Sequence, residues 1–294
     1  MSIQLKLDNK TAGYVLMITA LILYVLSDTI CKLFLMDYSA QQVTLFRTVS
    51  RLLPIMIACI FMKHNPLKTS RLHEHLIRAV IASMNTFLFM CAYKYAPMTD
   101  VYAIGYTSPF FILVFGYLML KEKLSINAIV SVCIGLIGAM IILQPKFDGG
   151  ISHVNVGAAF ALTASILAAL NNVLIKKLST TEHILTIVFF HAIVSLVFSF
   201  PLAISSWHSI IDMKGLLIGF TVVGIISAIC QCLISYALSI SKVSNLAATN
   251  YVTLLPVILI DSFYWNTFPQ KYVIVGMVLI IICNYLVIRK QKVC

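Results

Sequence analysis

The sequence predicts an all-α membrane protein with ten transmembrane helices, arranged as two inverted repeats of five helices each. Three observations lead to this fold class. The 294 residues are 61% hydrophobic and only 11% charged, with a mean hydropathy of +0.98, whereas charged residues make up about a quarter of a soluble domain. Apolar segments long enough to cross a hydrocarbon core of about 30 Å recur along the whole chain. The two halves of the chain also resemble each other.

Ten apolar segments account for nearly the entire chain. The first, residues 11–31, follows a basic lead without a small-residue cleavage site, so we expect a retained helix instead of a removed signal peptide. The other nine are expected at residues 42–62, 76–94, 99–119, 126–143, 154–175, 184–205, 215–238, 244–264 and 271–288. Little chain remains between these segments, and we therefore expect no separate soluble domain.

The internal similarity relates residues that lie 144 positions apart. This offset aligns Gly13 with Gly157, Thr19 with Thr163, Asp28 with Asn172, Lys32 with Lys176 and Arg47 with His191. We expect a first repeat over residues 11–143, containing spans 1–5, and a second over residues 154–288, containing spans 6–10. Because five is odd, the second repeat enters the bilayer with the opposite orientation. Inverted repeats are typical of secondary transporters, whose substrate site lies near the midplane between the repeats.

The basic residues indicate orientation and not nucleic-acid binding. The net charge is +11, but Lys and Arg residues stand singly at the ends of the spans and form no continuous stripe. If the N-terminus is cytoplasmic, fourteen of them, Arg78 included, face the cytoplasm and five face the other side. Because positive residues concentrate on the cytoplasmic side of membrane proteins, we expect both termini in the cytoplasm. The lipid bilayer is the expected partner, and nucleic acid is not.

An acid and a base occur inside the first two spans. Asp28 shares a helical face with Tyr24, and Arg47 lies on one face of the next span with Arg51. A charge at the centre of a bilayer costs about 2.5–3.5 kcal/mol, so such residues are functional candidates by default. A purely structural ion pair that holds two helices together explains them equally well. The sequence leaves both interpretations open.

Further polar and aromatic residues are expected to face the middle of the bundle. Tyr102, Tyr106 and Phe110 share a face of the fourth span, where aromatic rings suit a cationic or planar ligand. The same residues also occur in ordinary helix packing and in interfacial belts. The candidate substrate-binding residues are Asp28, Arg47, Tyr102, Tyr106, Phe110, Asn171, Asn172, His191, Gln231 and Asn250.

The sequence contains no pattern typical of enzyme chemistry. It has no metal-binding pair on a helix, no nucleophile elbow and no phosphate-binding loop. We therefore expect neither a catalytic site nor a metal or other cofactor. An integral membrane enzyme with His191 and Asp261 as acid and base is a weaker alternative, because these residues have no nucleophile or metal cluster beside them. The eight cysteines lie mostly within spans and are expected to be small buried hydrophobic residues.

The segment "YTSPFFILVFGYLMLKEKLSINAIVSVCIGLIGAMII", residues 106–142, resembles the end of an EamA-type repeat of the drug/metabolite transporter superfamily. Residues 156–288 resemble the second copy, so the similarity covers nearly the whole chain. In this family the fourth span ends in a Gly-Glu pair. Here Glu122 occupies the acidic position, Lys121 replaces the glycine, and Asn266 and Thr267 replace the pair in the second copy. A gating contact by the second glutamate is therefore not expected.

The resemblance implies ten helices around a central cavity, alternating access and a small organic substrate in a bacterial inner membrane. The segments "DTICKLF", "VTLFRTV", "LKTSR" and "ALNNVLIKKL" are similar to the S-adenosylmethionine uptake carriers of intracellular bacteria. With that substrate, Asp28 would balance the cationic end and Arg47 the carboxylate. Tyr102, Tyr106 and Phe110 would then contact the sulfonium or stack on the adenine. Export of an amino acid or related metabolite is the alternative, and a homodimer is left open.

Overall fold

The computed structural model describes residues 9–95, 101, 104–143, 156–207, 209, 213–264 and 271–289. These residues form helices and short connections, and no strand occurs among them. Seven described segments are long and apolar enough to cross a membrane, and three shorter apolar helices accompany them. The chain is therefore a multi-pass membrane protein. The count of ten spans stays a prediction.

The first half of the chain contributes five of the described helices. These are α1 (Asn9–Phe34), α2 (Ala40–Phe61), α3 (Leu72–Tyr95), α5 (Ser108–Leu120) and α6 (Ile126–Leu143). The start of α2 is fixed by a capping box, in which the Ser39 hydroxyl accepts from the Gln42 backbone N–H at 3.2 Å and the Gln42 side chain accepts from the Ser39 N–H at 3.3 Å. Two backbone donors that a helix start leaves unpaired are thereby satisfied.

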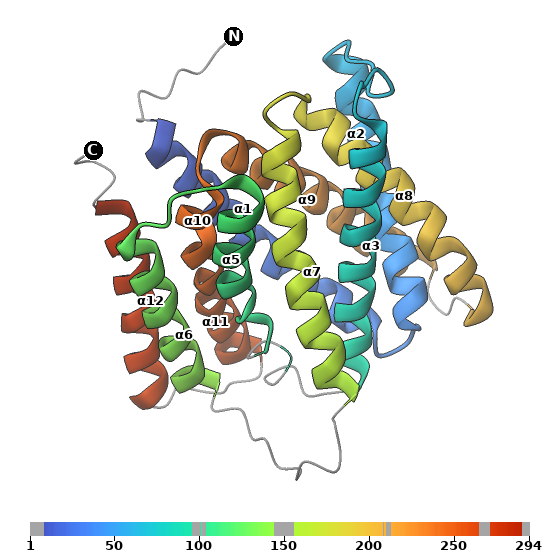
Figure 1. Ribbon diagram of the computed structural model, residues 1–294. Helices are drawn as coiled ribbons and strands as arrows, with labels where there is room; N and C mark the ends of the chain where they lie inside the picture. The colour runs from blue at the N-terminus through green and yellow to red at the C-terminus, as the bar shows by residue number, and fades with distance from the viewer. Residues whose placement is uncertain are drawn as a thin grey trace.

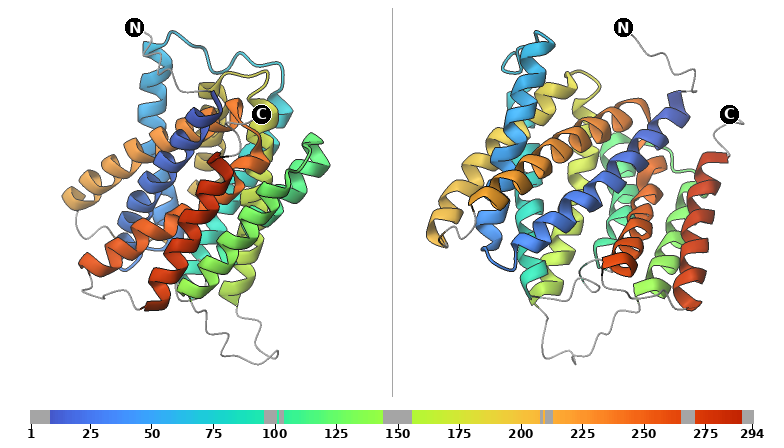
Figure 2. Two further views of the ribbon diagram at one scale, coloured as in Figure 1. Left: turned by 90° about the vertical axis from the view of Figure 1, so that its left-hand side faces the viewer. Right: turned by 180° about the vertical axis from the view of Figure 1, so that it is seen from behind.

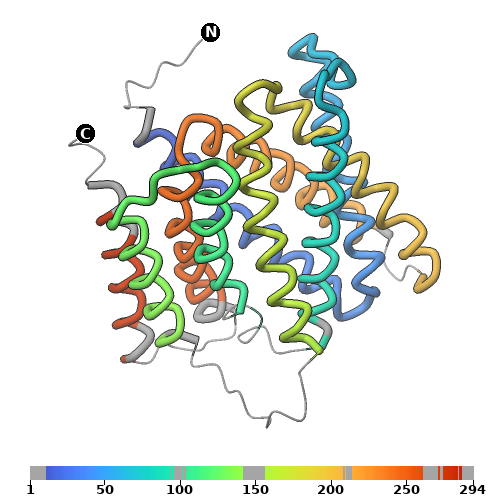
Figure 3. The backbone as a smooth tube through the Cα atoms, in the orientation of Figure 1, coloured from blue at the N-terminus to red at the C-terminus, as the bar shows by residue number. Residues whose placement is uncertain are grey.

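The second half contributes the remaining elements. These are α7 (Val156–Leu178), α8 (Ile184–Ser205), α9 (Met213–Ile240), α10 (Val243–Leu246), the 3₁₀ helix η1 (Ala247–Thr253), α11 (Leu254–Tyr264) and α12 (Lys271–Arg289). The His183 imidazole caps α8 by accepting from the Leu185 N–H at 3.2 Å. Figure 3 shows that the connections at residues 62–71, 121–125, 179–183 and 241–242 lie at one end of the molecule, here called the basic end.

Two expected spans are interrupted near their prolines. The helix expected over residues 99–119 has a turn at residues 106–107, and α5 begins only at Ser108, with Pro109 in its first turn. Proline suits this position because its missing N–H is not needed there. In the ninth span, the chain tightens into η1 just before Pro256. Pro256 cannot donate to the carbonyl four residues earlier, and short 3₁₀ segments are common where the α-helical ladder is broken.

Helices from the two halves pack against each other in pairs. α1 packs on α9, α2 on α8, α3 on α7 and α6 on α12 (Figure 1). Seen from behind in Figure 2, α1 and α9 run side by side and are inclined to α6 and α12. Gly224 of α9 lies directly on the Ser50 backbone of α2, and Gly138 of α6 lies on the Gly276 backbone of α12. A side chain at either glycine would push the paired helices apart.

The largest apolar core lies between α1, α5, α6, α7, α9, η1 and α12. Tyr251 of η1 is fully buried in it, and its hydroxyl donates to the backbone carbonyls of Tyr106 at 3.3 Å and Val132 at 3.1 Å. Both acceptors belong to the first half of the chain. Tyr251 therefore ties η1 to the residues that precede α5 and fixes the position of two cavity-lining segments.

Candidate functional site

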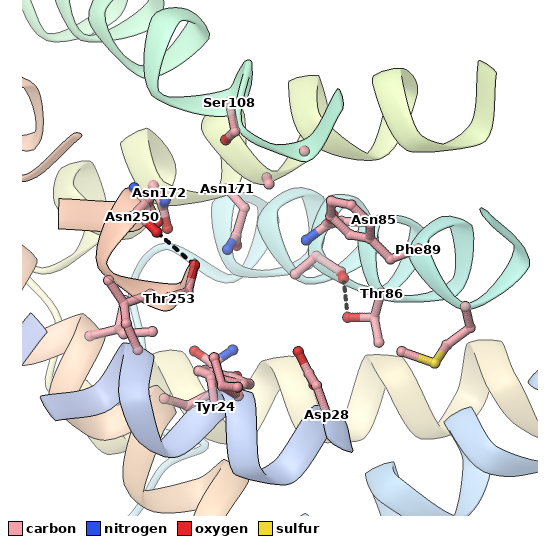
Figure 4. Close-up of a pocket in the computed structure, with 18 of the residues that line it drawn as sticks. Tyr24, Asp28, Asn85, Thr86, Phe89, Ser108, Asn171, Asn172, Asn250 and Thr253 are labelled. Atoms are coloured by element: carbon pink, nitrogen blue, oxygen red, sulfur yellow. Dashed lines mark hydrogen bonds between the residues drawn. The ribbon is translucent and has the colours of Figure 1, made fainter. Parts of the chain in front are cut away.

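A cavity of about 280 Å³ lies between the two halves of the chain. This volume is close to the lower end of the range of small-molecule sites, about 300–1,000 Å³. Figure 4 shows Tyr24 and Asp28 of α1 on one side, facing Asn85, Thr86 and Phe89 of α3 across the cavity. The remaining walls come from α2, α5, α7, α8, α9 and η1. Both halves of the chain therefore build the cavity.

Asp28 and Arg47 form an ion pair in the cavity wall. The Arg47 Nη1 donates to Asp28 Oδ1 at 2.7 Å, and the two side chains are 9% and 28% exposed, respectively. The guanidinium also lies 5.4 Å from the centroid of the Tyr24 ring, where a cation–π attraction adds to the pairing. The Asp28 carboxylate therefore neutralises one of the basic residues of α2.

A chain of hydrogen bonds connects the turn before α5 to η1 at another part of the wall. The Tyr106 hydroxyl lies 2.6 Å from Thr253 Oγ1, and Thr253 donates to the Asn250 carbonyl at 2.8 Å. Since Thr253 uses its own hydrogen for that bond, Tyr106 is the donor in the first contact. The Asn250 amide donates to the Ala247 carbonyl at 2.9 Å. These bonds hold the irregular backbone of η1 against the cavity.

Three further basic side chains lie in the cavity wall or directly behind it. Arg51 of α2, Arg78 of α3 and His191 of α8 are 5%, 0% and 2% exposed. Arg78 donates from Nε to Asn171 Oδ1 at 3.1 Å and from Nη1 to the Ile187 carbonyl at 2.6 Å. The Gln231 amide lies 3.3 Å from His191 Nδ1. Burying a charged side chain costs several kcal/mol. A buried arginine without a carboxylate partner is therefore a candidate for binding a ligand.

Most of the predicted site residues line this cavity. Those that do are Asp28, Arg47, Tyr106, Asn171, Asn172, His191, Gln231 and Asn250. Their role in binding a substrate stays a prediction. Phe110 does not line the cavity: it is 55% exposed, because α5 turns that side chain outward. Tyr102 lies outside the residues that the structure describes.

Sequence reasoning counted Arg78 among the basic residues at the cytoplasmic end, and the structure places its side chain inside the bundle. α3 begins at Leu72, so Arg78 lies six residues, about 9 Å, inside the helix and is fully buried. Its position within the apolar segment at residues 76–94 could have indicated that Arg78 is buried. Arg51 and Asn85 also line the cavity, although neither was among the predicted site residues. Removing Arg78 leaves thirteen basic residues on the expected cytoplasmic side.

Glu122 anchors the basic end. Its Oε1 accepts from the Val243 N–H at 3.0 Å, and its Oε2 accepts from the Ser244 N–H at 3.1 Å and the Ser244 hydroxyl at 2.7 Å. The carboxylate is buried and saturated by these three donors. The preceding Lys121 adopts a left-handed conformation, with φ of 52°. This is the position where the family resemblance places glycine, which tolerates positive φ without strain.

A pair of histidines also lies at the basic end. The rings of His64 and His183 are 4.2 Å apart, and His64 Nε2 lies 2.8 Å from the Thr186 hydroxyl. Partial burial, together with the neighbouring His64, lowers the pKa of His183 below its usual value. His183 therefore caps α8 as a neutral acceptor at physiological pH.

The described residues contain no group of three or more His, Cys, Asp or Glu side chains that could hold a metal ion. Cys31, Cys59, Cys230 and Cys283 are buried, whereas Cys133 is exposed. Buried thiols in apolar surroundings act as small hydrophobic residues. Among the described residues, the polar groups of the cavity that can contact a ligand are hydrogen-bonding and charged side chains.

The sequence pattern of the EamA-like transporter family matches residues 11–144 and again residues 155–289. The chain belongs to the EamA-like transporter family. The resemblance seen in the sequence is thereby confirmed. Family members are transporters, which agrees with the expectation that the protein is not an enzyme.

Individual relatives differ in what they carry. The chain is 24% identical to an S-adenosylmethionine uptake transporter of Rickettsia prowazekii, over 85% of this chain and 83% of the relative. It is 23% identical to a pseudopaline exporter of Pseudomonas aeruginosa, over 97% and 99%, and 24% identical to a riboflavin transporter of Rhizobium johnstonii, over 79% and 76%. A solved crystal structure matches 96% of the chain and 98% of its own length, with a TM-score of 0.79 at 15% identity, which shows a shared fold.

Proposed function

We propose that this protein is a secondary-active carrier that moves a small organic metabolite across the cell membrane by alternating access. The observation that carries the proposal is the polar cavity between the two halves of the chain, where Asp28, Arg47 and His191 line one space. Charged groups within a membrane are costly, so they are retained where they act on a ligand or an ion. In this view Asp28, Arg47, Tyr106, Asn171, Asn172, His191, Gln231 and Asn250 form the substrate site.

The proposal includes ten spans in two inverted repeats, over residues 11–143 and 154–288. Exchanging the repeats converts the packing of α1 on α9 into that of α7 on α3, and it leaves the α2–α8 and α6–α12 pairs unchanged. The helix pairing therefore supports a two-fold relation between the halves. Substrate sites of inverted-repeat carriers lie at this interface, and half-helices often border them. The change from the 3₁₀ helix η1 to the α-helix α11 beside the cavity fits that pattern.

The specific substrate that we propose is S-adenosylmethionine, which the carrier would take up. Its support is the similarity to the Rickettsia prowazekii transporter and a cavity that combines an acid, arginines and aromatic rings. The test is uptake of labelled S-adenosylmethionine into proteoliposomes, with empty liposomes as the control. Saturable uptake is expected. Stimulation by internal S-adenosylhomocysteine would indicate exchange, and stimulation by a pH gradient would indicate proton coupling. Absence of uptake in every arrangement would contradict this substrate.

Export of an amino acid or related metabolite is the second candidate. It is favoured by the similarity to the pseudopaline exporter, which extends over 97% of this chain. Pre-loaded proteoliposomes distinguish the two functions, because an exporter would release labelled amino acids down an imposed gradient. S-adenosylmethionine uptake without amino-acid release would contradict this second candidate.

We also propose a bacterial inner-membrane location with both termini in the cytoplasm. The support is the excess of basic residues on that side, which persists after Arg78 is removed from the count. Cys294 permits a direct test with a membrane-impermeant maleimide. Inverted vesicles should be labelled and intact cells should not, and Cys294→Ser should lose this difference. Labelling of Cys294 in intact cells would contradict the orientation.

A further inference from the structure

Arg51, Arg78 and His191 form a basic cluster at the cavity, contributed by α2, α3 and α8. All three side chains are at least nine-tenths buried. Arg51 and His191 line the cavity directly, and Arg78 lies behind the cavity-lining Asn171, to which it donates. Arg51 lies at the middle of α2, where a membrane-spanning helix is farthest from bulk water on either side.

The basic cluster lacks the carboxylate partner that Arg47 has. Among the described residues, no carboxylate oxygen lies within 4 Å of Arg51 or Arg78. Asp28, the acidic residue that lines the cavity, is engaged by Arg47 at 2.7 Å. The structural explanation that suits Arg47, an ion pair between helices, therefore does not extend to the basic cluster. Two buried positive charges remain without a counter-charge in the described part of the chain.

The basic cluster also presents hydrogen-bond donors that have no acceptor. Arg51 Nε has no partner, although this guanidinium also interacts with Tyr24. The Gln231 amide nitrogen donates to His191 Nδ1, which places the imidazole hydrogen on Nε2, and that atom has no partner either. An arginine and a ring N–H that line the same cavity match the oxygens of a carboxylate. Unpaired donors at this depth are expensive unless a ligand satisfies them.

The composition of the wall changes along α3. Arg78 lies behind the wall, and the α3 residues that line the cavity after it are Ala82, Asn85, Thr86, Phe89, Met90 and Tyr93. Along α3, an amide and a hydroxyl near the basic cluster are therefore followed by aromatic rings. The Oδ1 of Asn85 and the Oε1 of Gln231 have no donor partner and suit an ammonium group near the carboxylate.

We propose that Arg51 and His191 bind the carboxylate of the transported metabolite, with Arg78 adding positive charge behind them. This inference rests on the proposed carrier function and deepens it. The substrate class is a metabolite that carries an α-amino-carboxylate at one end and an apolar or aromatic group at the other. The carboxylate partner is then Arg51 and not Arg47, because Arg47 is already neutralised by Asp28.

A matched pair of substrates tests the proposal in proteoliposomes. S-adenosylmethionine and decarboxylated S-adenosylmethionine differ only in the carboxylate. Arg51→Gln should raise the KM for S-adenosylmethionine at least about tenfold, as expected when a charged partner is lost, and should leave the KM for the decarboxylated compound unchanged. Arg71→Gln, which removes a basic residue at the basic end, is the control and should change neither value. Equal effects of Arg51→Gln on both compounds would overturn the proposal.

A binding assay separates this proposal from the choice of S-adenosylmethionine as substrate. The thermal stability of the purified protein is measured with L-methionine and L-methioninamide, and with L-phenylalanine and L-phenylalaninamide. L-Methionine and L-phenylalanine, which carry a carboxylate, should raise the melting temperature of the wild-type protein, and their amides should not. Arg51→Gln should lose the shift, whereas Arg51→Lys should keep part of it because the charge remains. Equal shifts with acid and amide, or no shift with either acid, would overturn the carboxylate site even if transport of another substrate were found.

Discussion

Two carboxylates at the basic end are paired within the chain, whereas two buried donors of the cavity wall are not. At the basic end, Glu122 is saturated by three donors, and Glu74 contacts both Arg71 at 2.6 Å and Lys177 at 3.1 Å. In the cavity wall, Arg51 Nε and His191 Nε2 have no partner, although both residues are almost fully buried.

This difference distinguishes residues that stabilise the fold from residues that are available to bind a substrate. A polar group that is fully paired within the chain contributes to folding, because breaking its bonds strands the partner. A buried donor that lines the cavity and is left unpaired by the chain is available to a ligand. Asp28 and Arg47 are intermediate, since they line the cavity but neutralise each other. Substitutions in the two regions should therefore separate stability from transport.

The largest loss of stability is expected for Asp28→Asn. It leaves Arg47 charged and without its carboxylate, which should lower the free energy of unfolding by about 3 kcal/mol. Urea unfolding in detergent micelles, followed by circular dichroism, measures the change. The double variant Asp28→Asn with Arg47→Gln should recover part of the loss. A single variant as stable as the wild type would show that the pair is not structural.

Glu122→Gln should have the next largest effect on stability. The glutamine keeps one acceptor oxygen, but its amide N–H₂ would face the Ser244 N–H that now donates to the carboxylate. We expect a loss of about 2 kcal/mol, the contribution of a hydrogen bond to a charged group. The same unfolding assay applies, with the neighbouring exposed Lys123→Gln as the control. Equal stability of the two variants would contradict the anchoring role of Glu122.

Arg51→Gln should change stability by less than about 1 kcal/mol while impairing transport. The substitution removes a buried charge that lacks a carboxylate partner, so no carboxylate is stranded and a desolvation cost is relieved. Unfolding and uptake are measured on the same preparation. A stability loss as large as that of Asp28→Asn would place Arg51 in the scaffold and erase the distinction drawn between the two regions.

The smallest effect is expected from pH at His183. Burial and His64 lower the pKa of His183 in the folded protein, so the unfolded chain binds the extra proton more readily. Stability should therefore rise with pH up to about pH 6.5, the usual pKa of histidine, and fall as pH drops below it. Melting temperatures of the wild type and His183→Gln, compared over this window, should differ in slope. Identical slopes would show that His183 does not contribute.

Sequence reasoning predicted the membrane class and the family, and most of the site residues that it proposed line the cavity. Asp28, Arg47 and His191 stood out because charge or an imidazole within an apolar segment is rare. Phe110 was wrong as a cavity residue because helical spacing defines a face but not which neighbour covers that face. The burial of Arg78 was missed because α3 starts at Leu72, about one turn before the apolar segment. A helix can begin before its hydrophobic stretch does.

The sequence by itself determined the apolar character of the spans, the repeat over the two halves, and the presence of an acid and several bases inside the membrane. These properties follow from composition and periodicity, which are local. Only the tertiary structure decided that Asp28 pairs with Arg47, that Arg78 joins Arg51 and His191, and that η1 borders the cavity. Such pairings depend on which helices lie side by side, and that choice is made by packing between segments far apart in the chain.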